Sequence, residues 1–337
     1  MAEDLSLESS TVATSIEAIR GELSHTKLAT STLNLLVWID DPARRDWIRE
    51  RTGMLSRKHP SFTLVFDHTG ERDRDATVTT GRRDTATSVS VDEERVEIDV
   101  SGMSGQDVAG YVTALCTTGV PTVLWWSGFQ ESSRAIFAAL LPLIDTLVVD
   151  SSGGTRDATG LGALASFHAE HPEVALRDLA WLRLRPWQDM IANFFDDPAL
   201  AEELFTIRKL FVASGSESEA LYLAGWLASR LGWRATGKDT FADRDGDNVA
   251  FQRRRTGEIR RVQSICLDSD TSWYHGEVAG DAENVVRVWV EGEHAREPRL
   301  VPLQAIDNAS LLERAILERG LDELFETALR SAATLLG

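Results

Sequence analysis

The sequence predicts an α/β fold: a largely parallel sheet flanked by helices, followed by a smaller antiparallel β meander with C-terminal helices (α+β). Two observations predict it. Between residues 31 and 231, short apolar runs typical of buried strands alternate with segments of helical period. From Arg234 onward, alternating apolar and polar residues between Gly- and Asp-bearing turns replace that pattern. The expected domains are a polar N-terminal segment, 1–28, an α/β domain, 29–233, and the meander with its helices, 234–337.

The α/β part alternates strands and helices along the chain. Short apolar runs bounded by turn residues predict strands at Ser31–Trp38, Phe62–Phe66, Thr122–Trp126, Thr146–Val149 and Ile207–Ala213, and Val89–Val100 supplies one or two more. Along Leu179–Arg185, Leu182 and Leu184 alternate with Trp181, Arg183 and Arg185, which also predicts a strand. Helical spacing of apolar residues predicts helices at Ala13–Leu23, Pro42–Arg57, Gln106–Thr118, Ser132–Leu143, Gly160–His171, from Pro186 onward, and at Ser216–Leu231. Pro186 suits a first helical turn, and Ser216 with Glu219 has capping-box spacing. The polar stretch Glu71–Thr87 predicts a solvated loop or hairpin.

The C-terminal part has the alternation of an antiparallel meander. Four strands are expected, at Asn248–Arg254, Ile259–Leu267, Trp273–Val278 and Val285–Val290. Two helices follow, Ser310–Glu318 and Leu321–Leu336, with Gly320 as the C-cap between them.

Composition and charge narrow the classes of partner. The chain has 337 residues and a net charge of −18, so nucleic acid and anionic membrane surfaces would be repelled. No apolar run approaches the roughly 20 residues that span a bilayer. Cys116 and Cys266 lie far apart in apolar segments, so both are expected to be buried and unpaired. These features predict a cytoplasmic protein.

Three short motifs resemble ligand-binding sites, but their residues or the elements expected around them do not match such sites. In Gly232–Asp239 ("GWRATGKD"), Asp239 replaces the hydroxyl residue of a phosphate loop, and the segment follows a helix instead of a strand. Gly160–Ala165 ("GLGALA") has dinucleotide-type spacing, but no strand leads directly into it. His168 and His171 near a helix end are better explained by the helix dipole than by a metal. No cofactor, metal or catalytic constellation is therefore expected.

Tryptophan and arginine are concentrated in two segments. The chain has ten tryptophans, and Trp125 and Trp126 end one expected strand. Trp181, Arg183, Arg185 and Trp187 cluster where an expected strand meets a helix. Because Trp and Arg are enriched at protein interfaces, these six residues are the candidate partner-binding set. Burial of the tryptophans in the core is the alternative for the same residues.

Several longer segments carry a family resemblance. In order they are "RKHPSFTLVF" (57–66), "VPTVLWWSGF" (120–129), "LVVDSSG" (147–153), "DLAWLRLRPWQDMIANFFDD" (178–197), "ALYLAGWLASRLGW" (220–233) and "LLERAILERGLDELFETAL" (311–329). Together they resemble the OpcA family of glucose-6-phosphate dehydrogenase assembly proteins. The resemblance implies a non-catalytic cytosolic protein that binds oligomeric glucose-6-phosphate dehydrogenase and promotes its active state. It further implies a role in NADPH production by the oxidative pentose phosphate pathway.

The residues considered without the family resemblance also allow a second function. A sugar-phosphate- or nucleotide-binding enzyme or sensor would use the crevice at the strand ends of the α/β domain, with Arg183 and Arg185 as anion ligands.

Overall fold

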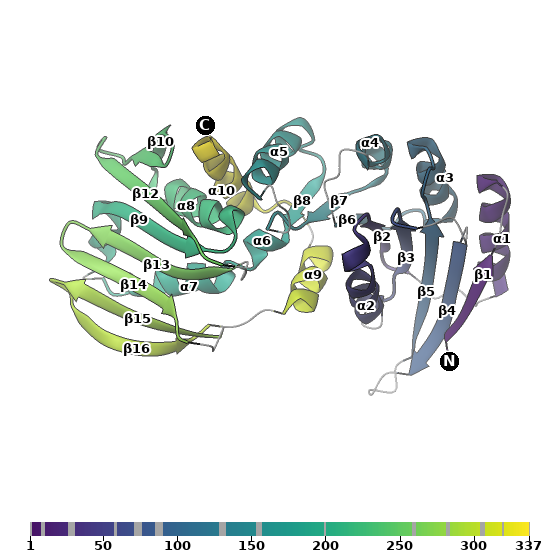
Figure 1. Cartoon of the computed structure of the whole chain (residues 1–337), viewed down its shortest axis with the longest axis horizontal. Helices are drawn as coiled ribbons and strands as arrows, with labels where there is room; N and C mark the ends of the chain where they lie inside the picture. Colours follow the sequence, from purple (N-terminus) through teal and green to yellow (C-terminus); the bar gives the residue numbers. More distant parts are fainter. Residues whose placement is uncertain are drawn as a thin grey trace. The chain divides into compact units, whose positions relative to one another are not determined.

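The computed structural model describes residues 2–7, 11–25, 31–56, 59–70, 76–84, 90–127, 133–152, 157–198, 200–257, 261–280, 284–303, 307–318 and 320–336. They form two compact units (Figure 1). Unit 1 comprises Met1–Asp150, Pro172–Arg177 and Leu312–Arg319. Unit 2 comprises Ser151–His171, Asp178–Leu311 and Gly320–Gly337. The predicted domain boundaries at residues 28 and 233 rest on changes in the pattern of apolar and polar residues, and they stay predictions.

Unit 1 is built on sheet A, whose strand order is β1-β4-β5-β3-β2-β6-β7-β8. The strands are β1 (Ala2–Leu7), β2 (Asn34–Ile39), β3 (Phe62–Asp67), β4 (Ala76–Asp84), β5 (Ser90–Asp99), β6 (Thr122–Trp126), β7 (Thr146–Val149) and β8 (Ala175–Asp178). Strands β5, β3, β2, β6 and β7 pair in parallel, as the sequence predicts. The last six strands of this order are β5-β3-β2-β6-β7-β8. If these six are numbered by their sequence along the chain, starting with β2, their order is 3-2-1-4-5-6, which is that of a dinucleotide-binding fold.

Burial explains why these segments form central strands. All six residues of β2 and all six of β3 are buried, which requires cover on both faces of the sheet. The helices of unit 1 are α1 (Val12–His25), η1 (Pro42–Arg44), α2 (Arg45–Ser56), α3 (Gly105–Leu115), α4 (Arg134–Leu140), η3 (Leu141–Leu143) and α9 (Asn308–Leu317), which belongs to this unit from Leu312 onward. Helix α3 begins with a complete capping box, in which Ser104 and Asp107 satisfy each other's backbone N–H groups.

Unit 2 is built on sheet B, in the order β10-β11-β12-β9-β13-β14-β15-β16. The strands are β9 (Ile207–Ser214), β10 (Arg234–Gly237), β11 (Thr240–Ala242), β12 (Asn248–Arg255), β13 (Val262–Ser269), β14 (Ser272–Val278), β15 (Val285–Gly292) and β16 (Arg296–Pro302). An antiparallel meander is confirmed for three of the four expected strands, β13, β14 and β15, and β16 extends it. The fourth expected strand, Asn248–Arg254, forms β12, which β9 separates from the meander. Strand β9 lies between β12 and β13, parallel to the first and antiparallel to the second. Its expected place in the parallel sheet was therefore wrong, since an apolar run indicates burial but not which sheet it joins.

Helices cover one face of sheet B. The helices of unit 2 are α5 (Asp157–Glu170), α6 (Leu179–Leu182), α7 (Arg185–Phe194), η4 (Ala201–Thr206), α8 (Glu217–Leu231), α10 (Glu323–Ala333) and η5 (Thr334–Leu336). Met190 of α7 fills the space over Gly276 of β14, where a Cβ would lie 2.8 Å from the methionine Cε. Phe194 and Phe195 pack on Tyr274 of the same strand. On the middle strands of sheet B, the apolar side chains that point to this side are buried: Leu210, Val212, Ile265, Leu267, Tyr274, Val286, Val288 and Val290.

Helix α10 packs closely on α8. A Cβ on Gly225 would lie 2.3 Å from the carbonyl oxygen of Ala328, so only glycine permits this approach of the two backbones. Gly320, at a φ of 85°, precedes α10 in the left-handed conformation expected of a glycine that ends a helix.

The strand expected at Leu179–Arg185 is wrong. Strand β8 ends at Asp178, whose side chain accepts a hydrogen bond from the Ala180 N–H and starts the short helix α6. All four residues of α6 are buried, so its apolar alternation did not reflect one covered and one solvated face. The helix from Pro186 is confirmed as α7, and its stripe of Trp187, Ile191 and Phe194 is buried.

The cysteines are unpaired, as expected, but neither is fully buried. Burial still raises the pKa of the Cys116 thiol to about 12 and that of the Cys266 thiol to about 11. In the described part of the chain, no helix has the length and apolarity needed to cross a membrane.

Candidate functional site

The four tryptophans of the predicted partner-binding set are core residues in this chain. Trp125, Trp126, Trp181 and Trp187 are 1%, 2%, 6% and 4% exposed. Trp126 stacks on Trp38 at 4.9 Å between ring centroids and meets Phe137 edge-on at 5.0 Å. A direct contact between these indoles and a partner would require them to leave the core, and burial favours the alternative role given above for the same residues.

The two arginines of the set have different surroundings. Arg183 is 11% exposed, and its Nη1 lies 3.1 Å from Oε1 of Glu219, a side chain only 2% exposed. The same nitrogen donates to Ser152 Oγ at 2.9 Å. Arg185 is 53% exposed and pairs with Asp189 one turn along α7. Arg183 therefore belongs to a buried ion pair, and Arg185 is accessible to a partner.

Asp178 is the centre of a second buried group of hydrogen bonds. Its Oδ1 accepts from the backbone N–H groups of Ser151, at 3.0 Å, and Ala180, at 2.9 Å. Its Oδ2 accepts from the Tyr222 hydroxyl at 2.8 Å. Ser218 of α8 donates to the Ser151 carbonyl at 3.1 Å. This network ties the segment after β7, helix α6 and helix α8 together.

Glu219 shows why the predicted capping box is only half formed. Ser216 Oγ accepts from the Glu219 N–H at 3.2 Å, as expected. The Ser216 N–H donates to Ser214 Oγ at 3.0 Å, and Glu219 Oε2 accepts from the Val262 N–H at 3.2 Å. The Glu219 carboxylate therefore joins α8 to β13 and to Arg183, and the two networks fix the fold of unit 2.

The first turn after β2 does not fit a dinucleotide. In folds with this strand order, a glycine-rich turn after the first strand cradles the pyrophosphate. Here the turn reads Asp40-Asp41-Pro42, and Asp41 uses its side chain to accept from the Ala43 N–H. Burial raises the pKa of the Asp40 carboxyl. Two carboxyl groups and a proline without an N–H replace the donors that phosphate needs.

The acidic residue after the next strand is already neutralised. In dinucleotide-binding folds, a carboxylate near this point accepts the ribose hydroxyls. Asp67 ends β3, and its Oδ2 lies 2.8 Å from Arg45 Nε and 3.4 Å from Arg49 Nη2. Its Oδ1 accepts from the Thr69 N–H at 2.8 Å. The residues of unit 1 therefore hold an internal ion-pair cluster where the fold would place a ribose.

The three ligand-like motifs have structural roles. Gly232 caps α8 in the left-handed conformation, at a φ of 73°, and β10 follows it. Residues Gly160–Ala165 lie inside α5. His168 contacts Glu326 of α10 at 3.5 Å. Among the residues that the structure describes, no three His, Cys, Asp or Glu side chains are grouped to hold a metal ion.

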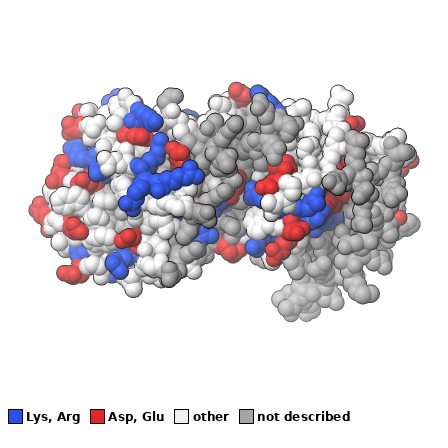
Figure 2. All heavy atoms as spheres, viewed as in Figure 1, with Lys and Arg blue, Asp and Glu red and all other residues white. Residues whose placement is uncertain are grey.

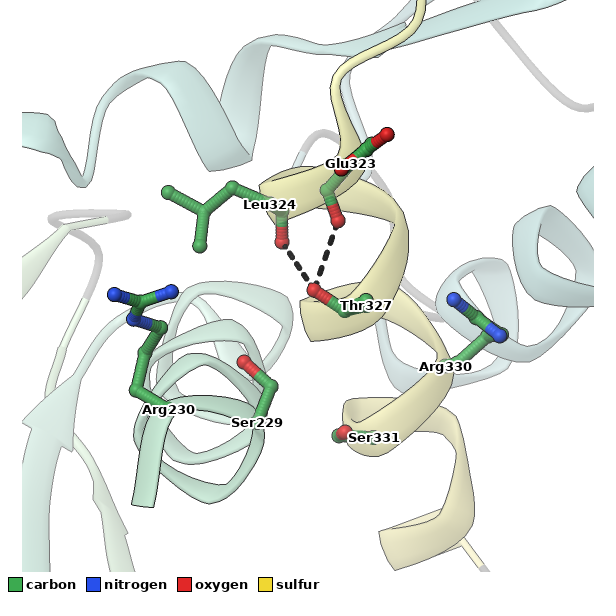
Figure 3. Close-up of a pocket in the computed structure, with 7 residues that line it drawn as sticks. All are labelled: Ser229, Arg230, Glu323, Leu324, Thr327, Arg330 and Ser331. Carbon is green, nitrogen blue, oxygen red and sulfur yellow. Dashed lines mark hydrogen bonds between the residues drawn. The ribbon is translucent and has the colours of Figure 1, made fainter. Parts of the chain in front are cut away.

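A groove between α8 and α10 carries arginines and hydroxyls, yet the hydroxyls of Ser229 and Thr327 bond their own helices (Figure 3). Thr327 Oγ1 donates to the carbonyls of Glu323, at 2.8 Å, and Leu324, at 3.1 Å. Ser229 Oγ donates to the Trp226 carbonyl at 2.8 Å. Arg230 and Arg330 are exposed, and in Figure 3 they lie on opposite sides of the groove. The groove has no convergent set of donors for an anion.

The other face of sheet B, away from α7 and α8, is open to solvent over its central strands. We call it the outer face. Its side chains alternate with the buried ones and are aligned by the strand register: Lys209, Phe211, Arg254, Cys266, Asp268, Trp273, His275, Glu277, Arg287, Trp289, Glu291 and Leu300. His275 stacks on Trp289 at 4.5 Å, and burial lowers its pKa. Figure 2 shows basic, acidic and uncharged side chains interspersed over unit 2.

Both units match one protein family. Residues 52–166 match the N-terminal domain of the glucose-6-phosphate dehydrogenase subunit family, and residues 174–329 match the C-terminal domain of the same family. The chain belongs to the OpcA family. The predicted resemblance is confirmed, and the two matches together cover most of the chain.

Cyanobacterial OpcA proteins are among the relatives. The chain is 34% identical to OpcA of Synechocystis sp. over 128 residues, which are 37% of this chain and 26% of that protein. It is 30% identical to OpcA of Nostoc punctiforme over 141 residues, 41% of this chain and 30% of that protein. The matched stretch thus spans less than a third of each of these relatives.

A solved oxidoreductase has a similar fold. The 3-ketoreductase KijD10 of Actinomadura kijaniata, in complex with TDP-benzene and NADP, superposes with a TM-score of 0.51 at 13% identity. The match covers 91% of this chain and 96% of that enzyme. At this identity the likeness concerns the fold alone, because sites differ within one fold.

Sequence reasoning missed the outer face as a candidate surface. Trp273 and Trp289 occupy the polar positions of alternating strands, where a solvated side chain is expected. That mismatch was the available signal.

Proposed function

We propose that the chain is a non-catalytic assembly factor that binds glucose-6-phosphate dehydrogenase and promotes its active oligomer. The observation that carries the proposal is the family match in both units, since both matching domains are described as parts of a glucose-6-phosphate dehydrogenase subunit. The protein would act in the cytoplasm and support NADPH production by the oxidative pentose phosphate pathway.

The geometry of unit 1 favours this function over an enzyme with the same fold. The turn at Asp40–Pro42 lacks the phosphate donors, and Asp67 is held by Arg45 and Arg49. In unit 2, Arg183 is paired with Glu219, so it offers no free charge to a sugar phosphate. The alternative of a nucleotide- or sugar-phosphate-binding enzyme or sensor therefore loses one of its two proposed anion ligands.

Activation requires a difference in affinity. An activator shifts an oligomer toward its active state only if it binds that state more tightly than the inactive one. The dehydrogenase should therefore need less substrate, or turn over faster, at the same total concentration when the chain is present. Arg185 stays a candidate contact, because its side chain is more than half exposed at the start of α7.

The test is an NADPH-forming assay with glucose 6-phosphate and NADP. Purified chain alone, the dehydrogenase of the same organism alone, and their mixture are compared over a range of chain concentrations. We expect no turnover by the chain alone and a saturable rise in the mixture. The variant Arg185→Ala should need more protein for half-maximal stimulation, and Asp189→Ala on the same helix is its matched control.

Turnover by the chain without added dehydrogenase would support the enzyme alternative. A dehydrogenase rate that does not change at any chain concentration would contradict the proposed activation.

A further inference from the structure

Exposed apolar side chains gather on the outer face of sheet B. Trp273 of β14 is 43% exposed and Leu300 of β16 is 65% exposed. Phe211 and Trp289 lie on the same face, on β9 and β15, and both are half-buried. Large aromatic residues on a solvated sheet face are typical of a surface that a partner covers.

The charges of this face distinguish it from the rest of the chain. Three cations, Lys209, Arg254 and Arg287, are interspersed with three carboxylates on the same rows of the sheet, so the face is close to neutral. The whole chain carries a net charge of −18. Two copies of this chain would therefore repel each other least when they approach through the outer faces.

The register makes the face complementary to itself. The outer-face residues named above lie on six of the eight strands of sheet B, β12-β9-β13-β14-β15-β16, and the midline of these six strands runs between β13 and β14. Lys209 and Glu291 lie on one row, linked through Asp268 and Trp273. A two-fold axis along that midline brings β9 of one copy over β15 of the other. It places Lys209 opposite Glu291 on that row.

The same axis pairs aromatic residues on the next row. Phe211, Cys266, His275 and Trp289 are aligned across the four strands. The operation therefore places Phe211 of one copy opposite Trp289 of the other. Identical surface patches that meet across a two-fold axis form the commonest kind of homodimer.

We propose that the outer face of sheet B binds a second copy of this chain, sheet against sheet, to form a homodimer. Strand spacings of about 4.8 Å and rises of about 3.3 Å give a face of about 25 by 20 Å. The projected area of about 500 Å² is smaller than the roughly 800 Å² per partner that stable interfaces bury, so the dimer is expected to be a weak one. The proposal concerns the chain alone and does not depend on the dehydrogenase.

The test is sedimentation equilibrium of the chain without other proteins at micromolar concentrations. We expect the mass of a dimer for the wild type and a shift toward the monomer, by at least tenfold in dissociation constant, for Trp273→Asp and for Leu300→Asp. Leu321→Asp is the matched control, because Leu321 is 60% exposed and lies just before α10, outside the strands of sheet B. Thermal melts identify a variant that fails to fold.

A charge exchange gives the sharpest outcome. Lys209→Glu and Glu291→Lys should each weaken the dimer, and the double variant should restore it. The two residues are three strands apart in one copy, about 14 Å, so the restoration cannot arise within a single chain. A monomeric wild type throughout the micromolar range would overturn the proposal. Dimers that Trp273→Asp and Leu300→Asp leave intact would overturn it too. So would outer-face variants that lose only dehydrogenase binding.

Discussion

Replacing Arg183 by alanine is expected to lower the free energy of unfolding by about 3–5 kcal/mol. The change removes the partner of Glu219, a carboxylate that is 2% exposed and cannot regain water. It also removes the donor to Ser152 Oγ. An uncompensated buried charge costs several times more than an exposed one. Urea unfolding followed by circular dichroism measures the loss.

Arg185 provides the control for this change. Its side chain is 53% exposed, and its partner Asp189 is 65% exposed. Pairs of this kind contribute little, so Arg185→Ala should change stability by no more than about 0.5 kcal/mol. Equal losses for the two alanine variants would contradict the assignment of Arg183 to the buried network.

The change Trp126→Ala is expected to cost about 3–5 kcal/mol, the range for a large aromatic residue removed from a core. Trp126 is 2% exposed and packs between Trp38 and Phe137. Its loss leaves a cavity next to β2, one of the two middle strands of sheet A. Equilibrium unfolding of unit 1, followed by tryptophan fluorescence, measures the effect.

Trp273→Ala is the matched variant from the outer face. Because Trp273 is 43% exposed, its removal should cost the isolated chain less than about 1 kcal/mol. The unfolding free energies of the variant and the wild type are compared at a concentration below that at which the chain associates. The difference then contains no contribution from the dimer interface. If Trp126→Ala lowered the free energy of unfolding no more than Trp273→Ala does, Trp126 would again be a candidate partner contact.

The central strands and the main helices followed from the sequence because their signals are local. Strand β2 is apolar throughout, which is expected only where both faces are covered. Pro186 and Ser216 mark helix starts through their own backbone and side-chain chemistry. Segments Leu179–Leu182 and β9 were misplaced because their neighbours in space, not their own residues, decide their conformation or their sheet.

The candidate site was harder to predict for a related reason. Trp125 and Trp126 point to opposite faces of β6, and both faces happen to be covered. Trp273 and Tyr274 are also neighbours on one strand, but only the side of Tyr274 is covered by helix α7. Which of two adjacent aromatic residues reaches solvent depends on the packing of a distant helix. The count of tryptophans contains no information on that point.

The measurement that tests the central claim most directly is the mass of the mixture with glucose-6-phosphate dehydrogenase. Sedimentation velocity of the dehydrogenase, with increasing amounts of the chain, reports both binding and the oligomer of the enzyme. The account predicts a new, faster species that contains both proteins and in which the fraction of assembled dehydrogenase rises with the chain. Two independent boundaries at every ratio, with the oligomer distribution of the dehydrogenase unchanged, would contradict it.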